Sequence, residues 1–213
     1  MTFIDISTLD PAKTIVVSTG NAHKVVEIEE ILGKVLPEVR FVALGELGDF
    51  PDAVEDGETF FDNALIKARY ALACTGLAMA VADDSGLCVD ALGGAPGVWS
   101  ARWAGEHGAD DANNEKLMRE MADVPEPERT ARFHSSVVLA YADGSVLSGE
   151  GDCEGRIGYT PVGTNGFGYD PLFIPEGYDQ TFGELPASVK SRISHRAKAS
   201  QAFIEMLHGL RSR

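Results

Sequence analysis

Short apolar runs alternate with stretches of helical periodicity along the first 84 residues, and this alternation constrains the fold more than any other feature. The apolar runs 14–18, 41–44 and 77–82 have the length of strands, and apolar residues three and four positions apart predict helices between them. The second of these helices spans 58–73, with a core stripe of Phe61, Leu65, Ala68 and Leu72. The β-α-β-α-β order is typical of an α/β protein.

The remaining sequence adds strands and two helices to the same mixed α/β domain. Residues 110–121 have helical periodicity, and the strand-like runs 132–141 and 145–151 flank the hairpin signal Ala142-Asp143-Gly144. Further strands are expected beside 163–166 and at 171–174, and the last helix carries Ala199, Ala202, Phe203, Met206, Leu207 and Leu210 on one side. We predict one domain over 14–213, preceded by a loose N-terminal extension, 1–13, of no assigned role.

The chain is acidic, with 33 Asp and Glu against 18 Lys and Arg and a net charge of −15. This balance argues against a protein that holds duplex nucleic acid by general phosphate attraction. Three cysteines without a CxxC pair favour a reducing compartment. The N-terminus lacks the pattern of a signal peptide, and the uncharged stretch 70–82 is too short to cross a bilayer. We therefore expect a cytoplasmic protein with no membrane partner.

Two adjacent carboxylates, Asp83 and Asp84, follow the apolar run 77–82, and we expect a small polar turn there to end the strand. Because successive strand residues point to opposite faces, one carboxylate can face a crevice at the carboxyl edge of the sheet, where open α/β sheets bind ligands. A carboxylate there, without a Lys or Arg nearby in sequence, favours a hard cation such as Mg²⁺. The alternative is a capped turn, since Asp and Ser are common turn formers.

A second candidate site lies between the first strand and its helix, at Thr19-Gly20-Asn21-Ala22-His23-Lys24. The unpaired amides and positive dipole of a first helical turn attract anions, and Gly20 lets the backbone approach a ligand. Lys24 opposes the dipole, so it fits a bound phosphate better than it fits helix stability. The spacing is neither that of a Walker loop nor that of a dinucleotide fingerprint. Asn21 as a simple helix cap is the alternative.

Glu55, Asn63 and Lys67 form a third group, in the loop before the second helix and on that helix. Asn63 and Lys67 are four residues apart and share one helix face. A solvated acidic loop accounts for Glu55 alone, and an ordinary polar face accounts for Asn63. Lys67 is harder to explain in that way, because cations are scarce in this chain.

Aromatic and cationic residues near the C-terminus favour a ligand with a flat, hydrogen-bonding ring. In Phe167-Gly168-Tyr169-Asp170 a ring can stack on a base, and the carboxylate or backbone amides can contact the base edge. An edge strand with one buried aromatic is the alternative. Lys190, His195 and Arg196 gather donors at the start of the last helix, where the dipole disfavours positive charge. A phosphate or a keto-purine edge explains these donors, and surface solvation is the alternative.

In this order, these residues resemble the inosine triphosphate pyrophosphatase family, the dITP/XTP pyrophosphatases. The resemblance covers residues 14 to about 210 and depends on many short motifs. The motifs are Ser18-Thr19-Gly20-Asn21 with Lys24 and Glu27, the segment 55–60 with Asn63 and Lys67, and the segments 82–87, 90–98, 100–102, 166–171 and 194–196. Trp99 stands where the family commonly has Tyr, which we do not interpret as a change of function.

The resemblance implies hydrolysis of the α–β bond of ITP, dITP or XTP to a nucleoside monophosphate and pyrophosphate, with Mg²⁺ as cofactor, by a homodimer. It also implies two lobes around an elongated mixed sheet flanked by helices, with the site in a central cleft. Glu55 and Asp84 are then expected to bind Mg²⁺, and Asp84 to activate water. The implied substrate-binding residues are Thr19, Gly20, Asn21, Ala22, His23, Lys24, Lys67, Ser85, Phe167, Gly168, Tyr169, Asp170, Lys190, His195 and Arg196.

Other functions fit parts of this pattern. A non-catalytic nucleotide sensor needs the phosphate-binding segment 19–24 but not Glu55 and Asp84 together. A hydrolase of modified pyrimidine triphosphates does not need the base-side segments 167–170 and 194–196. A haloacid-dehalogenase-type phosphatase is disfavoured, because its nucleophile motif has two Asp one residue apart, whereas Asp83 and Asp84 are adjacent.

Overall fold

The computed structural model describes residues 3–19, 25, 28–29 and 32–211, with side chains placed up to residue 208. The chain forms two compact units. The first unit comprises Met1–Asp84, Ser136–Glu150 and Ala199–Arg213, and the second comprises Ser85–Ser135 and Gly151–Lys198. Among the described residues, the first unit has two hydrophobic cores, and the second unit has one.

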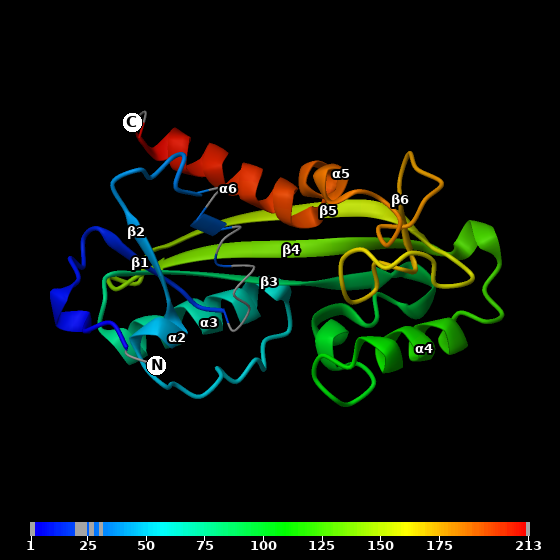
Figure 1. Ribbon diagram of the computed structural model, residues 1–213, viewed down its shortest axis with the longest axis horizontal. Coiled ribbons are helices and arrows are strands. Elements are labelled where there is room, and N and C mark those ends of the chain that lie inside the picture. The colour runs from blue at the N-terminus through cyan, green and yellow to red at the C-terminus, as the bar shows by residue number, and fades with distance from the viewer. Residues whose placement is uncertain (1–2, 20–24, 26–27, 30–31, 212–213) are drawn as a thin grey trace. The chain divides into compact units, whose positions relative to one another are not determined.

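A mixed six-stranded sheet of order β2-β1-β3-β4-β5-β6 organises the fold (Figure 1). Its strands are β1 (Thr14–Val17), β2 (Arg40–Ala43), β3 (Met79–Val89), β4 (Thr130–Tyr141), β5 (Val146–Ile157) and β6 (Phe173–Pro175). β1 pairs in parallel with β2 and with β3, whereas β5 and β6 are antiparallel. The predicted α/β class is therefore confirmed, and the parallel pairs follow from the predicted helical crossovers.

In the first unit, helices pack on both faces of the sheet. Successive residues of β1 alternate between the two cores, so Ile15 and Val17 contact one core and Val16 the other. The first core includes Phe203 of helix α6 (His195–Arg211), and the second includes Ala68 of helix α3 (Phe60–Thr75). Burial on both faces explains why the strands are continuous apolar runs.

Helix α3 buries a different stripe from the one predicted. Its buried residues are Phe60, Asn63, Ala64, Ala68, Ala71 and Thr75, whereas Phe61, Leu65 and Leu72 are half-buried. The stripe is rotated because small residues let the helix lie close to the sheet, and the larger Leu side chains then pack at its margin. Thr59 caps the helix, since its side-chain oxygen accepts a hydrogen bond from the Asp62 N–H.

In the second unit, helix α4 (Asp110–Glu120) packs with the ends of β3, β4 and β5. Leu117 and Met121 of this region join Leu87, Phe133 and Phe182 in one core. Helix α5 (Ala187–Ile193) lies at the edge of the same core. The remaining short helices are η1 (Ile6–Thr8), α2 (Leu44–Leu47), η2 (Asp90–Leu92), η3 (Gly97–Arg102) and η4 (Glu126–Glu128).

Three predictions about local structure are wrong. β3 does not end in a turn at Asp83 and Asp84 but continues to Val89, because Leu87 and Val89 are buried in the core of the second unit. Residues 158–172 form turns and loops, so no strand flanks 163–166. The N-terminal extension is not loose: Leu9 is buried, and Ile4 and Ile6 pack against the α3-side core.

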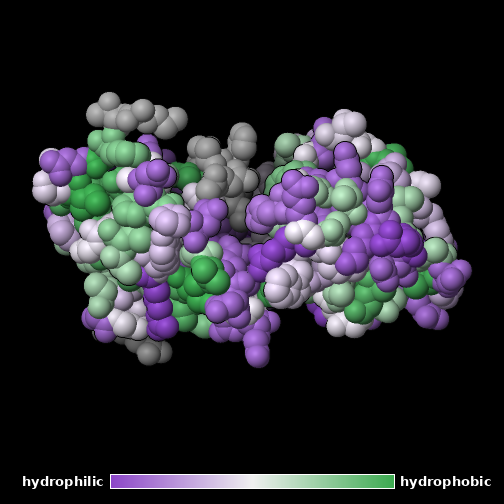
Figure 2. All heavy atoms as spheres, turned by 90° about the horizontal axis from the view of Figure 1, so that it is seen from below, coloured by the Kyte–Doolittle hydropathy of each residue, from purple (hydrophilic) through white to green (hydrophobic). Residues whose placement is uncertain are grey.

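One face of the molecule shows hydrophilic side chains interrupting smaller hydrophobic patches (Figure 2), in keeping with the high charge of the chain. Across the part of the chain that the structure describes, no helix combines the length and apolar character that a membrane crossing requires.

Candidate functional site

Glu55, Asn63, Lys67 and Asp84 form a carboxylate–lysine cluster in the first unit. The Nζ atom of Lys67 lies 2.9 Å from Oδ1 of Asp84 and 3.3 Å from Oε1 of Glu55. Asn63, one turn earlier on α3, donates to Oδ2 of Asp84 at 3.3 Å. The helix therefore holds a carboxylate of β3 and a carboxylate of the preceding loop around one ammonium group.

Asn63 is fully buried, which differs from the alternative of an ordinary polar helix face. Its side-chain oxygen accepts a hydrogen bond from the Gly57 N–H at 2.9 Å, while its NH₂ group donates to Asp84. A Cβ atom at Gly57 would lie 2.7 Å from that oxygen, so the loop can approach only as glycine. Asn63 thus connects the loop that carries Glu55 to the strand that carries Asp84.

Electrostatics keep Lys67 protonated in this cluster. Burial acts to lower its pKa, but the carboxylates of Asp84, Asp83 and Glu55 together raise the pKa above the ordinary value. The ammonium group therefore remains charged at neutral pH, and it balances part of the negative charge of the buried Asp83 and Asp84 and the half-buried Glu55.

The chemistry of this cluster fits Mg²⁺. Glu55 and Asp84 already converge on one cationic atom, and Mg²⁺ prefers one or two carboxylates, with phosphate and water oxygens completing its coordination. Among the described residues, no group of three or more His, Cys, Asp and Glu side chains is arranged to hold a metal ion. A cation at Glu55 and Asp84 would therefore take its other ligands from a substrate and water.

Thr19 is the second residue after β1. Between them, the Ser18 N–H donates to the carbonyl of Val81 on the neighbouring strand at 2.8 Å. The rest of the predicted phosphate-binding segment, Gly20, Asn21, Ala22, His23 and Lys24, lies outside the described residues.

The second unit contains a pocket of about 110 Å³, which we call the aromatic pocket. It brings together the seven residues expected around the base and also Ser85, which was expected to contact the substrate. The seven are Phe167, Gly168, Tyr169, Asp170, Lys190, His195 and Arg196. They come from β3, from the loop before β6, from α5 and from the first turn of α6. Gly86, Ser100, Ala101, Asp110 and Phe133 complete the lining, and sequence reasoning did not identify them.

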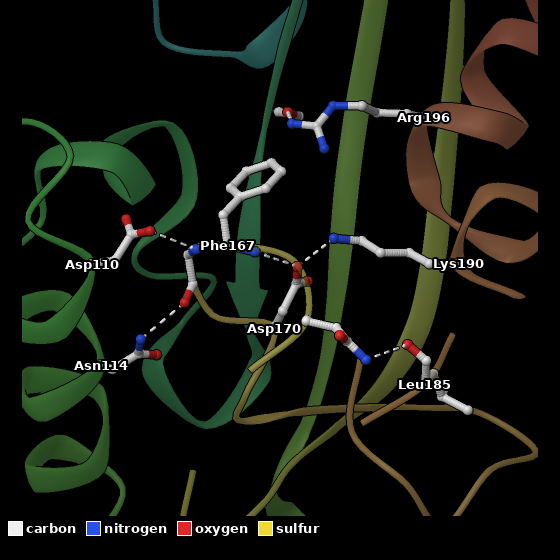
Figure 3. Close-up of polar contacts among 10 residues, drawn as sticks. Asp110, Asn114, Phe167, Asp170, Leu185, Lys190 and Arg196 are labelled. Carbon is white, nitrogen blue, oxygen red and sulfur yellow. Dashed lines mark hydrogen bonds and ion pairs between the residues drawn. The ribbon is translucent and has the colours of Figure 1, made fainter. Parts of the chain in front are cut away.

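Cations surround the exposed ring of Phe167 in this pocket (Figure 3). Lys190 Nζ lies 4.9 Å and Arg196 Cζ 5.2 Å from the ring centroid. Lys190 also forms an ion pair with the buried carboxylate of Asp170, and Arg196 donates to the Ser85 hydroxyl at 2.9 Å. Phe167 is 54% exposed, so its ring is available to a flat ligand.

The rings of Tyr169 and His195, which also line the pocket, have structural partners. Tyr169 is buried, and its hydroxyl donates to the carbonyl of Ser100 at 2.9 Å. Burial raises the pKa of this phenol, so it stays protonated. His195 stacks on Phe133 with 4.9 Å between ring centroids, and only 3% of it is exposed. Segment 167–170 is a turn with one buried and one exposed aromatic, which differs from the alternative of an edge strand.

A mixed six-stranded sheet with helices on both faces defines this chain as an α/β protein. The chain belongs to the Ham1 family, whose family model matches residues 15–206.

Two relatives with nearly half of their aligned residues identical to this chain are both dITP/XTP pyrophosphatases. The chain is 47% identical to a dITP/XTP pyrophosphatase of Corynebacterium efficiens, over 89% of this chain and 95% of that protein. It is 49% identical to a dITP/XTP pyrophosphatase of Rhodopirellula baltica, over 91% and 92% of the two chains. The solved structure of the Staphylococcus aureus Ham1 protein matches this chain with a TM-score of 0.84 at 35% identity. The match covers 93% of this chain and 100% of the Staphylococcus aureus chain.

Proposed function

We infer that this protein hydrolyses the non-canonical purine nucleoside triphosphates ITP, dITP and XTP to nucleoside monophosphates and pyrophosphate, which cleanses the nucleotide pool. The observation that carries this inference is the convergence of Glu55 and Asp84 on Lys67, in a chain matched over about nine-tenths of its length by dITP/XTP pyrophosphatases. The exposed ring and the cations of the aromatic pocket support a purine as the base.

We propose that Glu55 and Asp84 hold a Mg²⁺ ion, on the basis of their convergence and their oxygen chemistry. When bound, the ion would supply charge neutralisation for the phosphate oxygens and the leaving pyrophosphate. Lys67 binds the triphosphate of the substrate with its positive charge. The segment from Thr19 to Lys24 binds the triphosphate as well.

Asp84 is the proposed base. Its carboxylate accepts a proton from water while the water oxygen bonds to phosphorus, and the bond between the phosphorus and the bridging α–β oxygen breaks. Pyrophosphate leaves with the bonding electron pair. Asn63 and Lys67 each contact one oxygen of Asp84, so they orient the carboxylate for this proton transfer.

The aromatic pocket is assigned to the base. Phe167 offers a stacking surface, and Lys190, Arg196 and backbone amides are donors for the 6-keto oxygen of hypoxanthine or xanthine. The 6-amino group of adenine is itself a donor, so it could not accept hydrogen bonds from these donors. They would remain unpaired, which disfavours ATP.

A cytoplasmic homodimer is the remaining part of the proposal. All three cysteines are free thiols, which fits a reducing compartment. Sedimentation at about twice the mass of one chain would support the dimer, and a monomer at micromolar concentration would contradict it.

A panel of nucleoside triphosphates with Mg²⁺, scored for pyrophosphate against orthophosphate, tests the function. We expect pyrophosphate from ITP, dITP and XTP and little from ATP. Binding of ITP without any release of pyrophosphate would instead indicate a nucleotide sensor.

The Asp84→Asn variant tests the proposed base. We expect kcat for ITP to fall by about 100-fold or more, because the amide cannot accept the proton, while circular dichroism shows a retained fold. Asp56→Asn is the control, since Asp56 is an exposed carboxylate beside Glu55. Near-wild-type turnover by Asp84→Asn would refute the role.

A further inference from the structure

Helix α4 holds one residue, Gly168, of the loop that presents Phe167. Asp110, the first residue of the helix, accepts a hydrogen bond from the Gly168 N–H at 2.7 Å. Asn114, one turn later, donates to the Gly168 carbonyl at 2.9 Å. Figure 3 shows the side chains of Asp110 and Asn114 pointing toward the loop that carries Phe167. The residue that follows Phe167 is thus held through both of its backbone polar groups.

The other side of Phe167 is held as well. The Phe167 N–H donates to Oδ2 of Asp170 at 2.8 Å, and Asp170 is itself paired with Lys190. A Cβ atom at Gly166 would lie 1.9 Å from the same oxygen, so only glycine at this position lets the backbone lie so close to the carboxylate. The backbone on both sides of an exposed ring is therefore fixed, although the ring itself has room for a ligand.

Holding the backbone beside Phe167 costs conformational entropy. An exposed ring recovers little of that free energy through burial, so the restraint favours a ring that contacts a ligand. A ring that is already oriented loses less conformational entropy when a base stacks on it. Asp110 forms a charge-assisted hydrogen bond, which is stronger than a neutral one, and its carboxylate is also favoured at the N-terminus of α4.

We propose that Asp110 and Asn114 are positioning residues, which hold Gly168 by its N–H and its carbonyl so that the ring of the preceding Phe167 stacks on the purine base. This inference depends on the proposed function, since it needs a base in the aromatic pocket. It assigns helix α4 a part in base affinity that its sequence, an ordinary acidic helix start, does not indicate.

The test compares Asp110→Ala, Asp110→Asn and Asn114→Ala with Asp111→Ala. Asp111 is the exposed neighbour in the same helical turn and controls for the helix dipole. We expect Asp110→Ala and Asn114→Ala to raise KM for ITP by about 10-fold, as for partial loss of stacking, with kcat within about two-fold. Asp110→Asn retains an acceptor for the Gly168 N–H and should restore most of the affinity. Asp111→Ala should match the wild type.

Two readouts separate positioning from general destabilisation. First, inhibition by tripolyphosphate, which has no base, should be unchanged in all variants. Second, Asp110→Ala should have no further effect on KM when it is introduced into Phe167→Ala. An unchanged KM in Asp110→Ala, equal weakening of tripolyphosphate inhibition, or full additivity with Phe167→Ala would each overturn the inference.

If the wild type does not hydrolyse ITP, the proposed function fails and calorimetry with IMP decides the inference on its own. Weaker IMP binding by Asp110→Ala than by the wild type supports it. Equal affinities, including no binding by either protein, overturn it.

Discussion

Arg129 is a buried cation whose guanidinium group donates to four backbone carbonyls. Nε donates to Ile157 at 2.8 Å, Nη1 to Met121 and Val124, and Nη2 to Gly158 at 2.9 Å. Only 2% of the residue is exposed. Its planar fork matches several acceptors at once, which a Lys cannot do.

We expect Arg129→Met to lower the free energy of unfolding by about 3 kcal/mol, because the buried carbonyls lose their donor. Chemical denaturation measures this change. Arg119→Met is the control, since Arg119 is exposed and forms a long 3.9 Å pair with Glu120, so a change within about 0.5 kcal/mol is expected. Equal stabilities of the two variants would contradict the structural role of Arg129.

Arg196 gives a cleaner test of base recognition than Lys190 does. Removal of Lys190 would leave the buried Asp170 carboxylate without its ion pair, whereas Arg196 contacts the Ser85 hydroxyl and the Phe167 ring. We expect Arg196→Ala to reduce the ratio of kcat/KM for ITP over ATP by about 10-fold or more, because a donor for the keto group is lost. Arg192→Ala, an exposed cation on α5, is the control. An unchanged ratio would count against a base-side role of Arg196.

At the scale of elements, the close approach of α6 to β5 depends on Gly149. A Cβ atom there would lie 2.4 Å from the Phe203 nitrogen and 2.5 Å from the Ala199 oxygen, both backbone atoms of the helix. Because backbone cannot move aside as a side chain can, this glycine sets the distance between helix and strand in the first unit.

The Gly149→Ala variant should lose about 1–3 kcal/mol of unfolding free energy through overpacking. Gly45→Ala is the matched control, because Gly45 is helical and a Cβ atom there meets nothing within 4 Å. That control should be neutral or slightly more stable, since Ala favours helix. Thermal unfolding compares the two, and a wild-type Tm for Gly149→Ala would contradict the close packing.

At the scale of the whole molecule, the site chemistry is divided between the two units. The carboxylate–lysine cluster belongs to the first unit, and every residue of the aromatic pocket belongs to the second. The chain passes from one to the other between Asp84 and Ser85, inside β3. One strand therefore supplies the proposed base and a residue of the pocket in consecutive positions.

Global stability should decline in alkali because of Cys153. Burial raises the pKa of this thiol from 9.0 to about 11. Between these values the folded state keeps a proton that the unfolded state has lost, so the free energy of unfolding falls as pH rises. Denaturation at pH 8, 9, 10 and 11 should show a shallower decline for Cys153→Ala than for the wild type. Parallel curves would refute the raised pKa.

Much of the molecule follows from local sequence. Periodicity predicted α3, α4, α6 and the hairpin of β4 and β5, and each is present, because these segments bury a regular apolar face. The order of short motifs indicated the family. The aromatic and cationic residues Phe167, Tyr169, Lys190, His195 and Arg196 of the aromatic pocket were named from the sequence, since such side chains in an acidic chain stand out by their chemistry. Other lining residues, such as Asp110 and Phe133, were not.

Tertiary structure decided what no local pattern encodes. Asp83 and Asp84 lie inside a strand because residues from α3 satisfy Asp84, and Asn63 is buried because its amide joins two distant segments. Asp110 meets Gly168 across 58 positions of sequence. The sequence by itself determined the types of the main elements and the family. Periodic apolar patterns and short motifs are both formed by residues that are close together along the chain. Only the folded chain decided which polar groups are paired, since buried polar groups find partners through space.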